Sequence, residues 1–154
     1  MDKFNTHIEL ALYSQYTETV PIVRVQFANK TVWHDTVDDT KVINIVTPDL
    51  PAGNYWLSVR LENKDETEYQ RFNKDMMAGI EYVRIQNYDY EFSIYSEYEP
   101  IYPEIWYQEQ KNLGCEPAKI VHSNYLGWPG EWRLQIGLPV YRWIHVKTNQ
   151  GWLI

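Results

Sequence analysis

The chain has 154 residues, the size of one ordinary domain, and its 14 Lys and Arg against 21 Asp and Glu give a net charge of −7. Nucleic acid and anionic membranes both attract clustered cations, so this charge balance argues against either partner. A single cysteine, Cys115, excludes an internal disulfide and a multi-cysteine zinc site, and it fits folding in a reducing cytoplasm. No apolar run approaches the roughly 20 residues of a spanning helix, and the first residues do not read as a secretory signal.

Aromatic residues make up 16% of the chain, with seven Trp, thirteen Tyr and four Phe. Together with plentiful Val, Ile and Thr, this composition favours strands over helices. Trp and Tyr rings bury large areas with few rotatable bonds, so they serve cores and interfaces alike. We predict that most of these rings fill the core of an all-β domain with little helix.

Alternation of apolar and polar residues marks several short strands in the first part of the chain. A tight turn is expected at residues 28–30, because Asn29 tolerates the left-handed conformation. Short strands separated by turns about every eight to twelve residues are typical of a β-sandwich. The predicted strands cover residues 7–13, 22–27, 31–37, 41–47 and 54–61.

The segment from Leu50 to Tyr55 has the pattern of a tyrosine corner: a leucine, then Gly53, then a tyrosine at the start of a strand. In such a corner the tyrosine hydroxyl donates a hydrogen bond to the backbone upstream. After a polar stretch, alternation resumes and predicts strands at residues 80–87 and 91–95. The pattern predicts an antiparallel two-sheet sandwich, immunoglobulin-like or carbohydrate-binding-module-like.

The last third of the chain is rich in proline and glycine, and prolines at such density keep a chain irregular. Because it is equally rich in Tyr and Trp, we expect it to be ordered. Two final strands are predicted at residues 132–136 and 141–146. We therefore divide the chain into a β-sandwich at residues 1–95 and, at residues 96–154, an extended aromatic Pro/Gly-rich arm with the final strands. This arm packs on the same domain or on a neighbour.

The sequence carries no recognisable catalytic motif: it has no Gly-rich phosphate loop, no GxSxG and no HExxH. Its four histidines are widely spaced, and Cys115 has no base beside it in the sequence. Nothing singles out two of the 21 acids as the carboxylate pair that a glycosidase needs. We predict that the protein is not an enzyme.

Two acidic clusters are the candidates for a metal site. Calcium prefers about six to eight oxygen ligands, and loops of β-sandwiches often supply them. The spacing matches no EF-hand loop, and a solvated acidic loop that keeps the protein soluble explains the same residues. We predict no cofactor and keep calcium as the alternative, with the candidate ligands Asp35, Asp38, Asp39, Asp65 and Glu66.

Tryptophans outside the predicted core are the candidate binding residues. Trp56 alternates with Tyr55 and Leu57, so it lies on the outward face of its strand and needs a partner, either another chain or a ligand. Such ring faces stack on sugars, but we favour a protein partner. The candidate partner- or glycan-binding residues are Trp33, Trp56, Trp106, Trp128 and Trp152.

Two tryptophans on either side of Gly130 are predicted to have different roles. Trp132 alternates with Arg133, so it lies on the core face of its strand and is structural. Trp128 precedes Pro129 in an irregular turn where no strand face hides it. We therefore assign Trp128 to an interface.

Three stretches carry a resemblance to a known group of proteins: residues 49–59 (DLPAGNYWLSV), residues 63–67 (NKDET), and residues 126–134 (LGWPGEWRL) running into 139–143 (PVYRW). The chain resembles small virion-associated β-sandwich proteins of contractile-tailed bacteriophages, especially those infecting marine cyanobacteria. The N-terminal half is similar to xylan-binding carbohydrate-binding modules. The family's acidic loop usually ends in Asp-Thr where this chain has Glu66-Thr67, which weakens any calcium role carried over.

The resemblance implies a non-enzymatic structural protein of a phage particle, such as a decoration, neck, baseplate or tail component. Such a protein would fold in the host cytoplasm, join the virion in many copies and bind other virion proteins through its aromatic arm. The alternative function is a carbohydrate-binding module that adheres to glycans.

Overall fold

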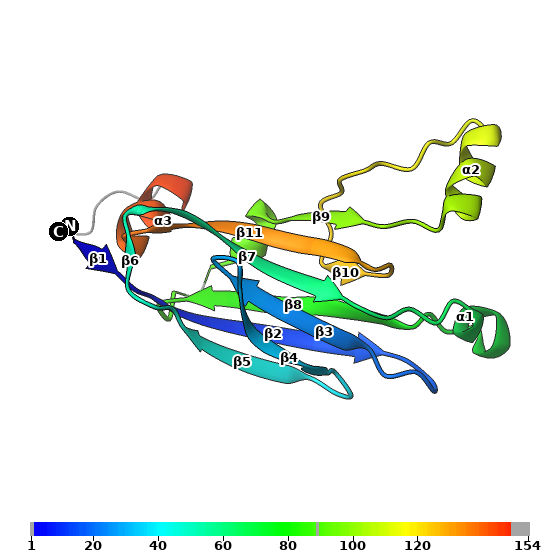
Figure 1. Cartoon of the computed structure of the whole chain (residues 1–154), viewed down its shortest axis with the longest axis horizontal. Helices are drawn as coiled ribbons and strands as arrows, with labels where there is room; N and C mark the ends of the chain where they lie inside the picture. Colours follow the sequence, from blue (N-terminus) through cyan, green and yellow to red (C-terminus); the bar gives the residue numbers. More distant parts are fainter. Residues whose placement is uncertain (1, 89, 149–154) are drawn as a thin grey trace.

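Most of the regular secondary structure lies in antiparallel sheets (Figure 1). The computed structural model describes residues 2–88 and 90–148. A four-stranded sheet has the order β10 (Tyr125–Leu126), β8 (Met77–Ile85), β2 (His7–Gln15), β5 (Lys41–Val46). A five-stranded sheet has the order β4 (Lys30–Thr36), β3 (Ile22–Phe27), β7 (Gly53–Leu61), β11 (Gly130–Leu138), β9 (Glu97–Pro100). A small third sheet pairs β1 (Lys3–Phe4) with β6 (Leu50–Pro51).

The two larger sheets pack face to face and enclose one apolar core. Alternation explains how: in β3, Val23 and Val25 are fully buried, and Arg24 between them faces outward. Burial of apolar area stabilises a fold by roughly 25 cal/mol per Å². The predicted all-β sandwich is confirmed. The largest fully buried side chains include Trp132, Phe27, Phe92, Leu10, Leu57 and Met76.

Most of the predicted strands correspond to observed ones, namely β2, β3, β4, β5, β7, β8 and β11. The turn between β3 and β4 places Ala28 and Asn29 at φ 51° and 65°, as the asparagine predicts. The tyrosine corner is also confirmed, because the Tyr55 hydroxyl donates to the Pro51 carbonyl at 2.6 Å. This bond fixes the entry of the chain into β7.

Two predicted strands are wrong. Residues 91–95 contain a 3₁₀ turn, η1 (Phe92–Tyr95), which buries Phe92 and leaves Ile94 exposed, whereas a strand would place both on one face. Residues 141–146 lie in helix α3 (Val140–Thr148), whose buried residues Val140, Trp143 and Ile144 have helical spacing. Pro139, directly before this helix, presets the backbone for a first helical turn.

Two further helices interrupt stretches that were expected to be irregular, and both lie at the same end of the sandwich, opposite α3 (Figure 1). Helix α1 (Thr67–Phe72) follows β7, and helix α2 (Glu104–Asn112) begins directly after Pro103. Among the described residues, no helix is long and apolar enough to cross a membrane.

The segment from residue 96 onward contributes to both sheets. Strands β9 and β11 complete the five-stranded sheet, β10 lies at the edge of the four-stranded sheet, and Trp132 enters the core. Between β9 and β10, residues 101–124 leave the sheets and form an excursion that contains α2 (Figure 1). This excursion builds one wall of the site described next.

Candidate functional site

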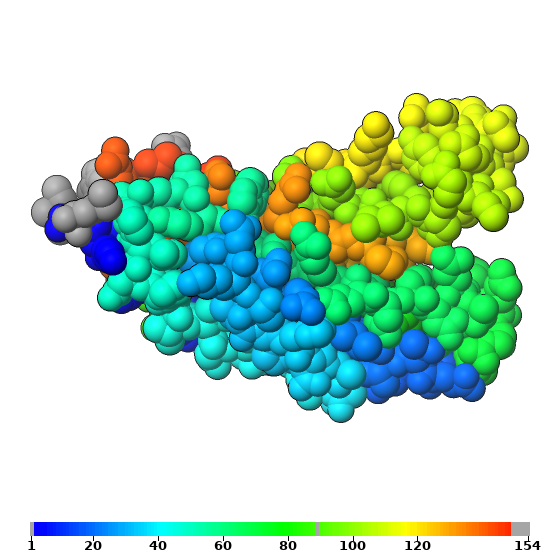
Figure 2. Space-filling view, in the orientation of Figure 1, coloured from blue at the N-terminus to red at the C-terminus, as the bar shows by residue number. Residues whose placement is uncertain are grey.

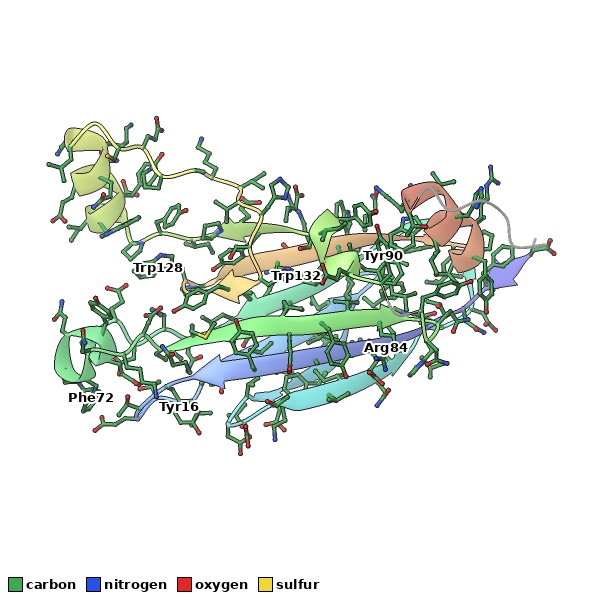
Figure 3. All side chains as sticks on the ribbon, turned by 180° about the vertical axis from the view of Figure 1, so that it is seen from behind. Tyr16, Phe72, Arg84, Tyr90, Trp128 and Trp132 are labelled. Atoms are coloured by element: carbon green, nitrogen blue, oxygen red, sulfur yellow. The ribbon has the colours of Figure 1, made fainter. Side chains whose placement is uncertain are left out.

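The molecule is hollowed at one end, between the lobes that carry α1 and α2 (Figure 2). A cleft of about 250 Å³ lies in this region, and we call it the aromatic cleft. Trp128 lies at the base of the opening between the two lobes (Figure 3). The residues that define the aromatic cleft are Asp75, Tyr98, Tyr102, Tyr125, Gly127 and Trp128.

Aromatic rings from two distant segments meet beside this cleft. The Trp106 and Trp128 ring centroids are 5.7 Å apart, and those of Tyr102 and Trp106 are 5.2 Å apart. Contacts at these distances add to the stability gained from burial. Trp106 and Tyr102 thereby hold α2 against the turn that precedes β11, and all three rings stay partly open to solvent.

A buried cation, the Lys64 ammonium group, lies next to the ring of Trp128. The Lys64 ammonium group donates one hydrogen bond to Asp75 Oδ1 at 2.5 Å and another to the Met76 carbonyl at 2.6 Å. The same ammonium group lies 5.1 Å from the centroid of the Trp128 ring. Because the Lys64 side chain is only 6% exposed, the charge of Asp75 holds it in place.

Asp75 is the polar centre of the cleft. Its Oδ2 accepts a hydrogen bond from the Tyr125 hydroxyl at 2.7 Å, while its Oδ1 faces Lys64. A carboxylate offers about four acceptor positions, so Asp75 has acceptor capacity left for a ligand. Burial raises the pKa of the Tyr125 phenol, and the hydrogen bond to Asp75 raises it further, so Tyr125 stays a neutral donor.

The backbone of the Trp128 turn is fixed from below by Tyr98. The Tyr98 hydroxyl donates to the Trp128 carbonyl and accepts from the Trp128 N–H at 3.2 Å. Burial raises the pKa of Tyr98 to about 12. Tyr98 therefore remains protonated and holds the backbone of Trp128 in one position at the cleft.

The predicted tryptophans divide among different environments. Trp106 and Trp128 come together at the cleft, as described above. Trp56 is 42% exposed on the outer face of the five-stranded sheet, which confirms its outward orientation. Trp33 lies opposite Val25 on the inner side of β4 and packs, half-buried, against the core. Trp152 lies outside the described residues.

Four of the five acidic candidates for a metal site already accept hydrogen bonds or form ion pairs with protein groups. Asp38 forms an ion pair with Lys41 at 2.9 Å, and the Lys41 hydrogen bond lowers the pKa of Asp38. Asp65 accepts from the Thr67 and Thr19 hydroxyls, which lower its pKa. Asp35 and Asp39 accept from the next backbone N–H, and Glu66 is exposed at the start of α1.

No group of three or more His, Cys, Asp or Glu side chains within residues 2–88 and 90–148 is placed to hold a metal ion. The carboxylate nearest to the aromatic rings, Asp75, already faces the Lys64 ammonium group. The residues of the cleft therefore do not fit a metal centre.

The polar and charged residues at the cleft, among them Lys64, Asp75 and Tyr125, were not indicated by the sequence. Lys64 and Asp75 lie at opposite ends of the segment that contains α1, and Tyr125 is 50 residues beyond Asp75. Their polar character gave no signal, because a solvated loop has the same composition. Only the pairing of the sheets brings them together.

No known family model matches the chain, and no curated protein sequence matches it. Two solved structures of vCBM60 are similar, each with 12% sequence identity and a TM-score of 0.51. The likeness shows a shared sandwich fold. The structure in complex with galactobiose matches over 83% of this chain and 96% of its own length, and the other over 84% and 89%. The latter is described as linking, by circular permutation, two families of calcium-dependent carbohydrate-binding modules.

Proposed function

We propose that this protein is a non-catalytic carbohydrate-binding module and that the aromatic cleft is its binding site. The observation that carries the proposal is the combination of partly exposed rings at Trp106, Trp128 and Tyr102 with a fixed carboxylate at Asp75. Sugar rings present an apolar C–H face and a rim of hydroxyl groups. An aromatic wall stacks on the first, and a positioned acceptor receives hydrogen bonds from the second.

The cleft is preorganised for such a ligand. Lys64 and Tyr125 hold Asp75 from two sides, and Tyr98 holds the turn that carries Trp128. Groups that are already fixed lose little conformational entropy when a ligand binds. The shared fold with a module that was solved with galactobiose supports the same class of ligand.

Calcium is not part of this proposal. The similar structures belong to calcium-dependent modules, but at this cleft a protein cation, the Lys64 ammonium group, already neutralises Asp75. We therefore expect sugar binding in the presence of a chelator.

A glycan array tests the proposed function directly. We expect the wild-type protein to bind a defined set of glycans, with equal signal in calcium and in chelator. Trp106→Ala should abolish this signal, since Trp106 packs on Tyr102 and Trp128, the two rings that line the cleft, and fixes their positions. Tyr141→Ala is the matched control, because Tyr141 is 56% exposed on α3 at the other end of the molecule. Absence of any bound glycan, or equal binding by Trp106→Ala, would overturn the proposal.

The role in a phage particle stays a prediction from the sequence resemblance. The exposed apolar side chains of the α2 lobe favour a protein partner, since Ile105 and Leu113 are each 76% exposed. Co-sedimentation of the purified protein with phage particles lacking it would test this role. Binding that is lost in Ile105→Asp would support it, and failure of the wild-type protein to sediment with the particles would count against it.

A further inference from the structure

The four-stranded sheet ends on one side in β5 (Lys41–Val46), and of the described strands only β2 pairs with it (Figure 1). The register between β5 and β2 has no shift. Ile43 and Ile45 point into the core, while Val42 and Val46 are 51% and 75% exposed on the opposite face. The strand therefore combines an open edge with exposed apolar side chains.

The backbone groups that face this open edge follow from the hydrogen bonds of β2. The His7 carbonyl accepts a hydrogen bond from the Gln86 N–H, directly after β8, so the backbone of His7 faces β8 and turns away from β5. In an antiparallel ladder, opposite residues either both face each other or both face away, and the two kinds alternate. Val46 is opposite His7, so its N–H and C=O point outward, as do those of Asn44 and Val42. In the part of the chain that the structure describes, nothing hydrogen-bonds to these outward groups.

The other edges of the two sheets are protected against pairing, and β5 is not. β4 has a register shift against β3, β10 has only two residues, and the bridge between Tyr98 and Val121 covers β9. Bulges, short strands and covering segments are means by which proteins block edge-to-edge association. β5 has no shift, no proline and no glycine, and its single charged residue, Lys41, lies at its end and pairs with Asp38.

The sequence of β5 is a palindrome. Residues 42–46 are Val-Ile-Asn-Ile-Val, with Asn44 at the centre. Two antiparallel copies related by a two-fold axis through Asn44 place identical residue types opposite each other, and opposite residues share one face of a sheet. The exposed Val42 then contacts Val46 of the partner subunit, and Ile43 contacts Ile45 of the partner subunit on the core side.

The same register also satisfies the free backbone groups. Val42, Asn44 and Val46 all face outward, and in this register they pair only with one another, so each N–H lies opposite a C=O of the partner subunit. A shift by one residue would turn the exposed valines to the core side of the partner subunit. A shift by two would pair Val42 or Val46 with a residue outside the strand.

We propose that β5 is a self-association edge: two copies of the chain join through antiparallel β5 strands, and their four-stranded sheets become one continuous sheet. Such an interface uses the same patch on both copies, as two-fold dimers do. The palindrome favours a second copy over an unrelated strand. The pairing does not depend on the proposed function. Because the paired strands run in opposite directions, the two aromatic clefts lie at opposite ends of the dimer.

Analytical ultracentrifugation over a range of protein concentrations tests the association. We expect the wild-type chain to reach twice the mass of the monomer as its concentration rises. Val46→Lys should raise the dissociation constant at least about tenfold, since it places a charge beside Val42 of the partner subunit. Val146→Lys is the matched control, because it makes the same change at a valine that is 68% exposed on α3, and it should associate like the wild-type chain.

Cysteine cross-linking tests the register. Both variants carry Cys115→Ser, because Cys115 is exposed. Asn44→Cys places two thiols across the two-fold axis, with Cα atoms about 5.5 Å apart, a distance that a disulfide spans. Mild oxidation with oxidised glutathione should therefore link the two copies. Val46→Cys is the control, since the two thiols would lie four residues apart along the strands, about 13 Å, and should not be linked.

The outcomes decide the proposal. Linkage through Asn44→Cys but not through Val46→Cys, together with a weakened dimer in Val46→Lys, supports it. A wild-type chain that stays monomeric up to millimolar concentration would overturn it. So would a dimer that Val46→Lys leaves intact, a dimer that Val146→Lys weakens equally, or equal linkage of the two cysteine variants. Circular dichroism spectra that match the wild type show that the variants are folded.

Discussion

Trp128 and Trp132 are four residues apart and have opposite surroundings. Trp132 is fully buried between the sheets, and its indole N–H donates to Asn124 Oδ1 at 3.2 Å (Figure 3). Trp128 is half-buried against Trp106 and Lys64. The sequence predicted the buried position of Trp132, because the alternation of apolar and polar residues along a strand can be read from the residues directly before and after it. It could not predict what surrounds Trp128, since those contacts come from segments more than 20 residues away.

Trp132→Ala should lower the free energy of unfolding by about 3–5 kcal/mol, because it leaves a large cavity in the core and an unpaired Asn124 side chain. Urea denaturation followed by circular dichroism measures this. Trp56→Ala provides the contrast, since Trp56 is largely exposed and its removal should cost far less. Equal losses in the two variants would contradict the assignment of Trp132 to the core.

At the scale of elements, the longer strands were predictable, whereas the short strands β1, β6, β9 and β10 and the helices were not. In β3 the period of two is unbroken, and the predicted and observed bounds coincide. In α3 the polar Arg142 lies between Tyr141 and Trp143, so the same criterion gave a strand where the buried residues have helical spacing. In α2 no residue is buried, so no apolar periodicity marked it.

Helix α1 is anchored by a buried carboxylate. Glu68 is fully buried and accepts hydrogen bonds from the backbone N–H groups of Thr17 and Thr19 at 2.5 and 2.6 Å. Burial alone would raise the pKa of Glu68, but these hydrogen bonds outweigh it and hold the pKa below its ordinary value of 4.5. The charged Glu68 carboxylate thus links helix α1 to the loop between β2 and β3 through these hydrogen bonds.

The depressed pKa of Glu68 predicts a pH dependence of stability. The contribution of the Glu68 carboxylate to the free energy of unfolding is fully present above the unfolded-state pKa of about 4.5. It is lost as the pH falls through the lower pKa of the folded state. Glu68→Gln should therefore destabilise the protein by roughly 1–3 kcal/mol at neutral pH and lose less stability on acidification. Urea midpoints at about pH 7 and pH 3 compare the two proteins. Parallel pH profiles would show that Glu68 has no such role.

At the scale of the whole molecule, the sandwich is a rigid base that carries the cleft on loops at one end. Gly127 keeps the cleft open: a Cβ atom at this position would lie 3.0 Å from the Tyr125 ring and 3.5 Å from Asp75 Oδ2. The cleft therefore depends on the absence of a side chain, which no alternation in the sequence indicates.

Gly127→Ala should lower sugar affinity about tenfold by narrowing the cleft, with a change in stability below about 1 kcal/mol. Isothermal titration with a glycan selected on the array measures the affinity, and thermal melting measures the stability. Gly53→Ala is the matched control, since a Cβ atom there meets Tyr55 only at an ordinary 3.7 Å. Identical affinities of the two variants would argue against binding in the cleft.

The central claim, that the aromatic cleft binds sugar, is tested most directly by the indole N–H signals in a ¹H–¹⁵N spectrum. Each signal is assigned by single Trp→Phe substitution, and the protein is titrated with galactobiose and with the glycans that the array selects. We predict that the signals of Trp106 and Trp128 shift with the ligand, while that of the buried Trp132 does not. A ligand that binds without moving the Trp106 and Trp128 signals would contradict the claim.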